Sequence, residues 1–276
     1  MKLIFAAILT STVVLFAVAV IAEEKGGHPV SQLVAHRGSS IDRPECTIAS
    51  TKRAIKSGAT ATEVDVRRTK DGVLVILHDN TLDRTTSGTG PLSDITYAEL
   101  KALDAGSWFD KKYASQRVPR LSQVLSLCKN RIDILLDLKE TDDPEYVHQV
   151  VSEVKEFGDP AGTVIGVRSV EHAKMFRQLL PEARQIGLIA GPEHIEEYAE
   201  AGVETIRLWP RWVEVSMGAD DPLVKRVRSA GAALHINGGD GSRESIMPIL
   251  SFNPDSTSSD APALAVKWLR KLKRWK

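Results

Sequence analysis

Cysteine and net charge are both scarce in this sequence, and each scarcity excludes a class of protein. The two cysteines, Cys46 and Cys128, lack CxxC spacing and a companion histidine cluster, which excludes a zinc finger and a thioredoxin-like redox motif. We expect both thiols to be free and buried, as small core residues. The 36 Lys and Arg residues equal the 36 Asp and Glu residues, so the chain lacks the positive field that a non-specific nucleic-acid binder needs.

The composition is that of an ordinary globular protein. Hydrophobic residues make up 42% and charged residues 26% of the 276 residues, which excludes disordered and collagen-like classes. That length suits one α/β barrel of about 250 residues.

The first 22 residues have the pattern of an export signal. Lys2 is followed by an almost wholly apolar run from Leu3 to Ile21, and Ala22 is the small residue expected at a cleavage site. We expect residues 1–22 to be a signal peptide or, since the run is long enough to span a bilayer, an uncleaved anchor. In both cases residues 23–276 form the exported domain, periplasmic or extracellular.

Short β-type runs alternate with helical stretches in this domain, as is typical of βαβ units around a parallel sheet. Eight predicted strands fit a (β/α)8 TIM barrel. The predicted strands are Gln32–Ala35, Thr62–Arg67, Ile132–Leu138, Thr163–Val167, Gln185–Ile189, Thr205–Leu208, Ala233–Ile236 and Ser256–Ser259. Apolar residues three and four positions apart predict the helices Glu145–Phe157, Val170–Leu180, Pro192–Ala201 and Pro222–Ala230.

One long segment interrupts this alternation. An extra β-like run, Val73–Leu77, precedes residues 79–119, which are rich in Gly, Ser, Thr and Asp and include a predicted helix, Tyr97–Leu103. Such an insertion is unusual in a compact barrel, so we expect it to cover or shape a site.

Carboxylates gather at the carboxyl ends of two predicted strands, where barrel enzymes keep their active sites. Glu63 and Asp65 stand two residues apart, so both point to one face of their strand, which in a barrel is the lumen. Adjacent buried carboxylates repel unless a cation neutralises them, and oxygen ligands favour Mg²⁺ or Ca²⁺ over zinc. Asp137 and Lys139 repeat this spacing and add a third carboxylate and a cation suited to a phosphate oxygen.

Two histidines close two further predicted strands, in His36-Arg37-Gly38 and His78-Asp79. Each feature alone has a structural interpretation, since a histidine at a strand end or a Glu-x-Asp pair on a solvated edge needs no function. Together they supply charge neutralisation, a cation for phosphate and an acid/base pair, which metal-assisted phosphoryl transfer needs.

The motifs around these residues resemble those of the glycerophosphodiester phosphodiesterase family. The densest block spans about fifty residues, and weaker similarities extend over nearly the whole domain. The matching motifs are Ala35-His36-Arg37-Gly38, Pro44-Glu45-Cys46-Thr47, Gly58-Ala59, Glu63-Val64-Asp65-Val66, Thr69-Lys70-Asp71-Gly72, His78-Asp79-Asn80-Thr81-Leu82-Asp83-Arg84-Thr85-Thr86, Pro119-Arg120-Leu121, Asp137-Leu138-Lys139 and Ser259-Asp260-Ala261-Pro262.

The resemblance implies hydrolysis of a small glycerophosphodiester to sn-glycerol 3-phosphate and an alcohol. It implies that His36 and His78 are the general acid/base pair and that Arg37 and Lys139 bind the substrate phosphate. One divalent cation, Ca²⁺ or Mg²⁺, is expected. The metal ligands that the resemblance implies are Glu63, Asp65 and Asp137, and Glu45 belongs to the site as a metal ligand or a substrate-ordering group.

Three positions depart from the family pattern. Cys46 replaces a common Asn, Asp137 replaces the usual Glu, and Leu234 stands where a Trp is frequent. These departures leave open a barrel that binds phosphodiesters without turnover. A second alternative, a lysophospholipase D that uses the same site, is favoured by the basic residues 267–276 and by an uncleaved anchor.

The C-terminal segment is strongly basic. Residues 267–276 hold six Lys or Arg residues and two tryptophans without any acid, a composition that suits contact with an anionic membrane surface. The alternative is the solvated end of the last barrel helix, with Trp268 and Leu272 packed inward.

Overall fold

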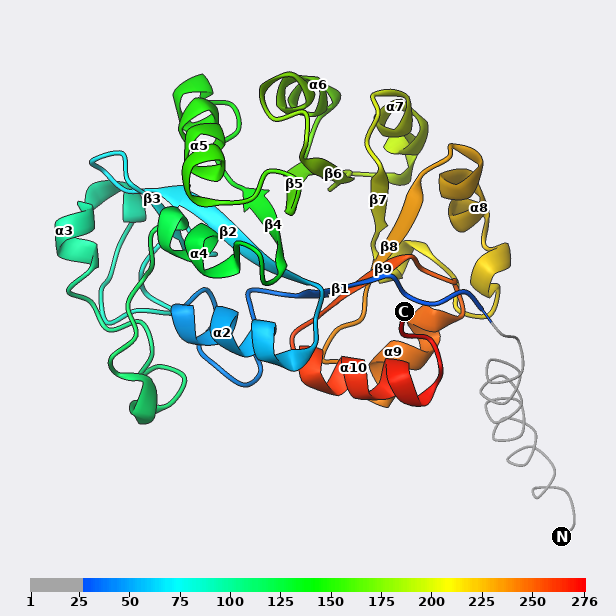
Figure 1. Ribbon diagram of the computed structural model, residues 1–276, viewed down its shortest axis with the longest axis horizontal. Helices are drawn as coiled ribbons and strands as arrows, with labels where there is room; N and C mark the ends of the chain where they lie inside the picture. Colours follow the sequence, from blue (N-terminus) through cyan, green and yellow to red (C-terminus); the bar gives the residue numbers. More distant parts are fainter. Residues whose placement is uncertain (1–26) are drawn as a thin grey trace, which may run out of the picture.

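The computed structural model describes residues 27–276, which form a closed barrel of eight parallel strands inside a ring of helices (Figure 1). The predicted signal peptide or anchor, residues 1–22, lies outside the described residues. The barrel strands are β1 Gln32–Ala35, β2 Ala61–Arg68, β4 Asp133–Leu138, β5 Thr163–Val167, β6 Arg184–Gly187, β7 Thr205–Leu208, β8 Ala233–Asn237 and β9 Ser256–Ser259. Closure comes from β1, which pairs in parallel with both β2 and β9.

Helices follow the strands in sequence, as right-handed βαβ crossovers require. The outer helices are α2 Ile48–Ser57, α4 Leu121–Cys128, α5 Pro144–Phe157, α6 Val170–Leu179, α7 Ile195–Glu200, α8 Pro222–Ser229, α9 Arg243–Leu250 and α10 Pro262–Lys271. Short 3₁₀ turns add η1 Leu92–Asp94, η2 Lys111–Tyr113, η3 Pro192–His194, η4 Pro210–Trp212 and η5 Gly218–Asp220.

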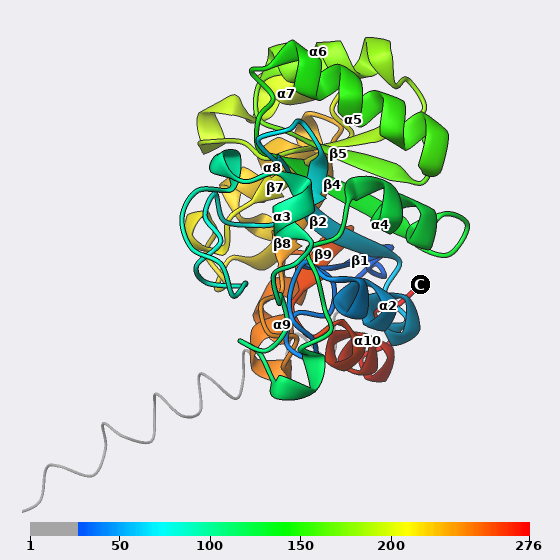
Figure 2. The same ribbon diagram turned by 90° about the vertical axis from the view of Figure 1, so that its left-hand side faces the viewer.

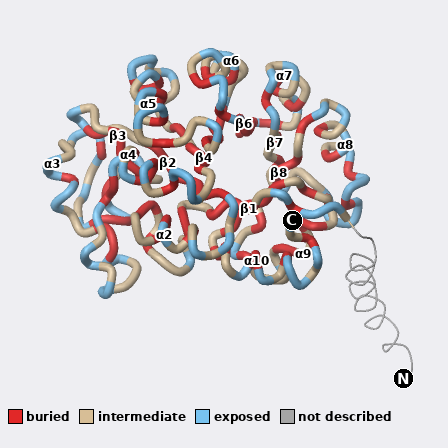
Figure 3. The backbone as a smooth tube through the Cα atoms, in the orientation of Figure 1, coloured by how far each residue is buried: buried red, intermediate tan, exposed pale blue. Residues whose placement is uncertain are grey.

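Alternation along the strands divides the core into two layers. Val64 and Val66 of β2 join the large cluster that packs against the helices, whereas Ala61 belongs to a small cluster with Val34 and Leu135 inside the barrel. Figure 3 shows buried residues along the strands, with exposed stretches on the surrounding helices. Glu63 and Asp65 alternate with Val64 and Val66 along β2, so their side chains face the lumen, as Ala61 does.

The segment between β2 and α4 has its own core. Its strand β3 Leu74–Ile76 runs antiparallel to β2, and its helix α3 Tyr97–Leu100 lies beside β3 (Figures 1 and 2). Val75 and Leu77 pack with apolar residues of the segment, including Leu82 and Leu100. The insertion is thus anchored to the sheet through β3.

Two predicted helices differ from the observed ones. The prediction Tyr97–Leu103 is too long, because Ala102 and Leu103 donate to carbonyls only three residues back, which tightens the helix end into turns. The predicted helix Pro192–Ala201 is split into the turn η3 and the helix α7.

The basic C-terminal segment packs against the barrel. Leu272 and Trp275 contact an apolar cluster that includes Val30, and the Arg274 side chain is buried and donates to the carbonyl of His28 at 3.1 Å. Trp268 is only partly buried, with Lys271 over its ring. Within residues 27–276, the helices are all too short or too polar to cross a bilayer.

Candidate active site

Three carboxylates meet in the lumen at the carboxyl end of the barrel. Asp65 on β2 is in register with Asp137 on β4, and Glu63 lies two residues before Asp65. One oxygen from each of the three side chains lies within 4.8 Å of the others. Glu63 and Asp65 are only 5% and 1% exposed, so water does little to screen their repulsion.

Two cationic side chains hold this carboxylate cluster together. Lys139 Nζ lies 2.7 Å from both Asp65 Oδ1 and Asp137 Oδ2. Arg168, which follows β5, donates to the other oxygen of Asp137. Burial would raise the pKa of Asp137, but the charges of Lys139 and Arg168 outweigh it, and the net shift is downward.

Among the described residues, Glu63 is the member of the cluster that forms no ion pair with a lysine or arginine side chain. Its Oε2 accepts from the backbone N–H of Arg37 at 2.8 Å. Burial and the charge of Asp65 raise the pKa of Glu63 to about 7. An all-oxygen ligand set in which one buried carboxyl resists ionisation is the environment that a hard divalent cation stabilises, so these residues fit such an ion.

Each site histidine is held by a carboxylate. His36 Nδ1 lies 2.6 Å from Asp260 Oδ1, and His78 Nδ1 lies 2.6 Å from Asp79 Oδ1. Burial lowers the pKa of His36, but the hydrogen bond to Asp260 outweighs this and the pKa is raised overall. The carboxylate at Nδ1 leaves Nε2 of each ring for proton exchange.

Arg84, in the insertion, connects the loop after β1 with the segment that carries His78. Arg84 donates from Nη1 and Nη2 to the two oxygens of Glu45 at 2.9 and 2.8 Å, and from Nε to Asp79 at 2.6 Å. Glu45 also accepts from Arg37 Nη1 at 3.0 Å. Burial would raise the pKa of Glu45, but Arg84 and Arg37 lower it overall. Glu45 therefore orients Arg37 and stands outside the carboxylate trio.

The loop after β1 is shaped by local backbone chemistry. Gly38 has φ +79°, and a Cβ built there would lie 2.5 Å from Ser50 Oγ, so only glycine fits against α2. Thr47 caps α2 by accepting from the N–H of Ser50. Cys46, which lies between Gly38 and Thr47, is buried, and its thiol donates to Asp65 Oδ2 at 3.6 Å. Cys46 and Cys128 are both free and buried, as predicted.

The predicted site residues therefore come together, along with further residues to which the sequence analysis gave no role. Asp79, Arg84 and Asp260 stand in the motifs quoted above, and Asp260 directly follows a strand end, a signal that could have identified it. Arg168, just after β5, and Arg207, on β7, lie outside those motifs.

Two residues of β8 have structural roles. The His235 side chain is buried, with Nδ1 2.8 Å from Ser256 Oγ and Nε2 3.3 Å from Ser258 Oγ, and burial lowers its pKa to about 3. Leu234 packs in the core on the helix side of the barrel, so this departure from the family pattern does not reach the lumen.

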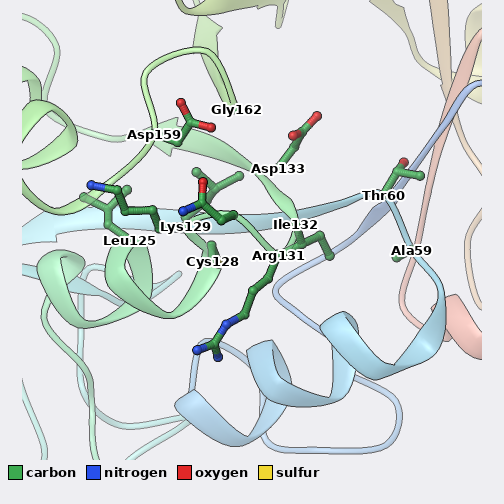
Figure 4. A pocket seen from close by; sticks show the side chains of 12 residues that line it. Ala59, Thr60, Leu125, Cys128, Lys129, Arg131, Ile132, Asp133, Asp159 and Gly162 are labelled. Carbon is green, nitrogen blue, oxygen red and sulfur yellow. The ribbon is translucent and has the colours of Figure 1, made fainter.

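A pocket of about 450 Å³ opens at the other end of the barrel (Figure 4). The pocket is lined by Cys128, Arg131 and three residues at or just before strand starts, Thr60, Asp133 and Gly162. It therefore lies away from the carboxylate cluster.

Comparison with known proteins gives consistent matches. A model of the glycerophosphoryl diester phosphodiesterase family matches residues 36–262. The chain is 37% identical over 161 residues to a glycerophosphodiester phosphodiesterase of Caldanaerobacter subterraneus, covering 57% of this chain and 65% of that protein, slightly less than two thirds of its length. A glycerophosphodiester phosphodiesterase of Bacillus subtilis is 32% identical over 222 residues, covering 73% and 74% of the two chains.

A solved structure has the same fold. The glycerophosphodiester phosphodiesterase from Agrobacterium tumefaciens superposes with a TM-score of 0.71 at 29% identity, covering 86% of this chain and 99% of that one.

Proposed function

Because the chain belongs to the glycerophosphoryl diester phosphodiesterase family, we propose that it hydrolyses glycerophosphodiesters to sn-glycerol 3-phosphate and an alcohol. The observation that carries the proposal is the pair of carboxylate-bound histidines, His36 and His78, in a site that also holds Arg37 and Lys139. A site that only bound a phosphodiester would have no need of two acid/base groups.

The first step transfers the phosphoryl group within the substrate. His78 accepts the proton of the glycerol 2-hydroxyl, whose oxygen forms a bond to phosphorus. The bond from phosphorus to the alcohol oxygen breaks, and His36 donates its proton to that oxygen. The raised pKa of His36, kept up by Asp260 against burial, suits it to start protonated.

The second step opens the cyclic phosphate with the two roles exchanged. His36 accepts a proton from water as the water oxygen bonds to phosphorus, and His78 returns a proton to the departing 2-oxygen. Arg37 and Lys139 orient the phosphate and offset the charge that develops on its oxygens.

Glu63, Asp65 and Asp137 are proposed to hold one divalent cation, Ca²⁺ or Mg²⁺, which when bound would supply positive charge to the phosphate oxygens. Asp137 already forms ion pairs with Lys139 and Arg168. Binding of a metal ion would therefore require these ion pairs to lengthen or an Asp137 oxygen to contact both a side-chain cation and the metal.

The test is release of glycerol 3-phosphate from glycerophosphocholine and glycerophosphoethanolamine by the exported domain. We expect turnover that EDTA abolishes and that Mg²⁺ or Ca²⁺ restores. Turnover of lysolipid vesicles alone would assign a lysophospholipase D, and binding without any turnover at high enzyme concentration would assign a binding barrel.

We propose export as the location, periplasmic or extracellular, on the sequence of residues 1–22. The mass of the protein recovered from the exported fraction distinguishes cleavage after Ala22 from an uncleaved anchor. Contact of the basic C-terminal segment with membranes is tested by co-sedimentation with anionic vesicles, and the packing of Leu272 and Trp275 predicts little binding.

A further inference from the structure

Within the described part of the chain, two arginines, one near the end of β7 and one in the turn that follows, have no carboxylate partner. Arg207 lies on the same side of β7 as Thr205, whereas Ile206 and Leu208 face the helix layer, so Arg207 is directed into the barrel mouth. Arg211 follows in η4. Across residues 27–276, neither guanidinium makes a hydrogen bond or an ion pair, and the buried Nε of Arg207 has no partner.

Both arginines stack on one indole ring. The guanidinium carbon of Arg207 lies 4.2 Å from the ring centroid of Trp209, and that of Arg211 lies 5.0 Å from it. Stacking uses the face of a guanidinium and leaves its N–H edge free to donate. Trp209 is therefore a cation–π partner of both arginines, and among residues 27–276 no acceptor engages the donors of either guanidinium.

The other cations of the mouth are already engaged by carboxylates. Their pairs are Arg37 with Glu45, Arg84 with Glu45 and Asp79, Lys139 with Asp65 and Asp137, and Arg168 with Asp137. The charges of Asp137 and Glu63 act on Arg207 from nearby, yet burial dominates and lowers the pKa of Arg207. The buried Nε of Arg207 without a hydrogen-bond partner is costly, and an anion that accepts from it removes that cost.

Resting on the proposed function, we propose that Arg207, Arg211 and Trp209 form a subsite for a second anionic group of the substrate, a carboxylate or a phosphate. The glycerol half of the substrate is uncharged, so this group must belong to the alcohol half. The enzyme therefore favours glycerophosphodiesters whose leaving alcohol is itself anionic.

A matched pair of substrates tests the subsite. Glycerophosphoserine and glycerophosphoethanolamine differ by one carboxylate on the alcohol. We expect kcat/KM for the serine ester to exceed that for the ethanolamine ester by about tenfold, the usual effect of one charge-assisted hydrogen bond. Arg207→Met and Arg211→Met should bring the ratio toward one, whereas Arg131→Met, at the opposite end of the barrel, should leave it unchanged.

The outcomes separate the subsite from the proposed function. Equal kcat/KM for the two esters in the wild type, or an equal loss on both in the Arg207→Met variant, would overturn the subsite; the latter result would assign Arg207 to the shared phosphate. If neither ester is hydrolysed, the proposed function fails, and calorimetric binding of the same two esters still measures the ratio. A third ester, whose alcohol ends in a phosphate, shows whether carboxylate or phosphate is preferred.

Discussion

At the scale of single residues, the two His–carboxylate pairs differ in how the chain builds them. His78 and Asp79 are adjacent, so their pair forms within one strand end. His36 and Asp260 are 224 positions apart and meet only because β9 closes the barrel beside β1. The first pair is thus a local structure, and the second depends on the complete fold.

Removing either histidine should abolish turnover without unfolding the protein. His36→Ala and His78→Ala should each lower kcat by roughly 10²–10⁴, the usual contribution of a general acid or base. Circular dichroism and the melting temperature should stay close to wild type, because neither ring is in an apolar core cluster. His148→Ala, on the exposed side of α5, is the matched control, and retained activity in both site variants would contradict the mechanism.

Asp260→Asn should change the pH profile. The hydrogen bond to Asp260 raises the pKa of His36, and without the carboxylate burial prevails and the pKa falls. If His36 acts while protonated, the alkaline limb of kcat/KM should move to lower pH, with a fall in kcat at neutral pH. A limb that stays in place would show that the profile reports another group and that Asp260 has only a structural role.

At the scale of elements, the turn between β1 and α2 sets the position of His36 and Arg37. Gly38 and Gly72 have nearly the same φ, +79° and +81°, but a Cβ at Gly38 would meet Ser50 whereas one at Gly72 would meet nothing within 4 Å. A substitution at Gly72 therefore introduces backbone strain alone, whereas one at Gly38 introduces the same strain together with a steric overlap.

Substitution of these two glycines should give unequal losses of stability. Gly72→Ala should lower the free energy of unfolding by about 1–2 kcal/mol, the strain of a left-handed residue. Gly38→Ala should cost about 1–3 kcal/mol more, because α2 must shift to admit the methyl group. Urea unfolding of both variants measures the difference, and equal losses would show that the loop yields without strain.

The elements that sequence patterns predict well are those fixed by local chemistry. The strand β5 spans Thr163–Val167 as predicted, because a short apolar run between turn residues needs no distant information. The helix α3 is shorter than predicted, because its end is decided by turn bonds that periodicity does not encode.

At the scale of the whole molecule, the spacing of charges predicts which residues gather but not which residues pair. Glu63 and Asp65 share a face by periodicity alone, and the order of strands brings Asp137 beside them. In contrast, Arg84 reaches Glu45 across 39 positions, and Arg168 reaches Asp137 from the next strand. Such long side chains take positions that depend on every packed neighbour, which a single sequence does not specify.

The charge balance of the closed barrel predicts how metal and pH act together on stability. The pKa of Glu63 is raised from 4.5 to about 7, so the folded state retains a proton that the unfolded state releases. In the metal-free protein, Glu63 should therefore contribute stability that is lost as the pH rises through that interval, whereas His235, whose pKa is lowered to about 3, contributes in the opposite direction. A bound cation requires ionised Glu63, so it should stabilise the protein more at pH 8 than at pH 5.

Scanning calorimetry with EDTA, and then with excess Mg²⁺ or Ca²⁺, checks this prediction at the two pH values. An ion at about 100 times its Kd adds about 2.7 kcal/mol, and for a protein of this size each kcal/mol raises the melting temperature by roughly 2–4 °C. Glu63→Gln copies the protonated carboxyl, so this variant should lose most of the metal effect, and in EDTA its stability relative to wild type should increase from pH 5 to pH 8. Equal stabilisation at both pH values would mean that the cation binds without requiring ionised Glu63, which would contradict this prediction.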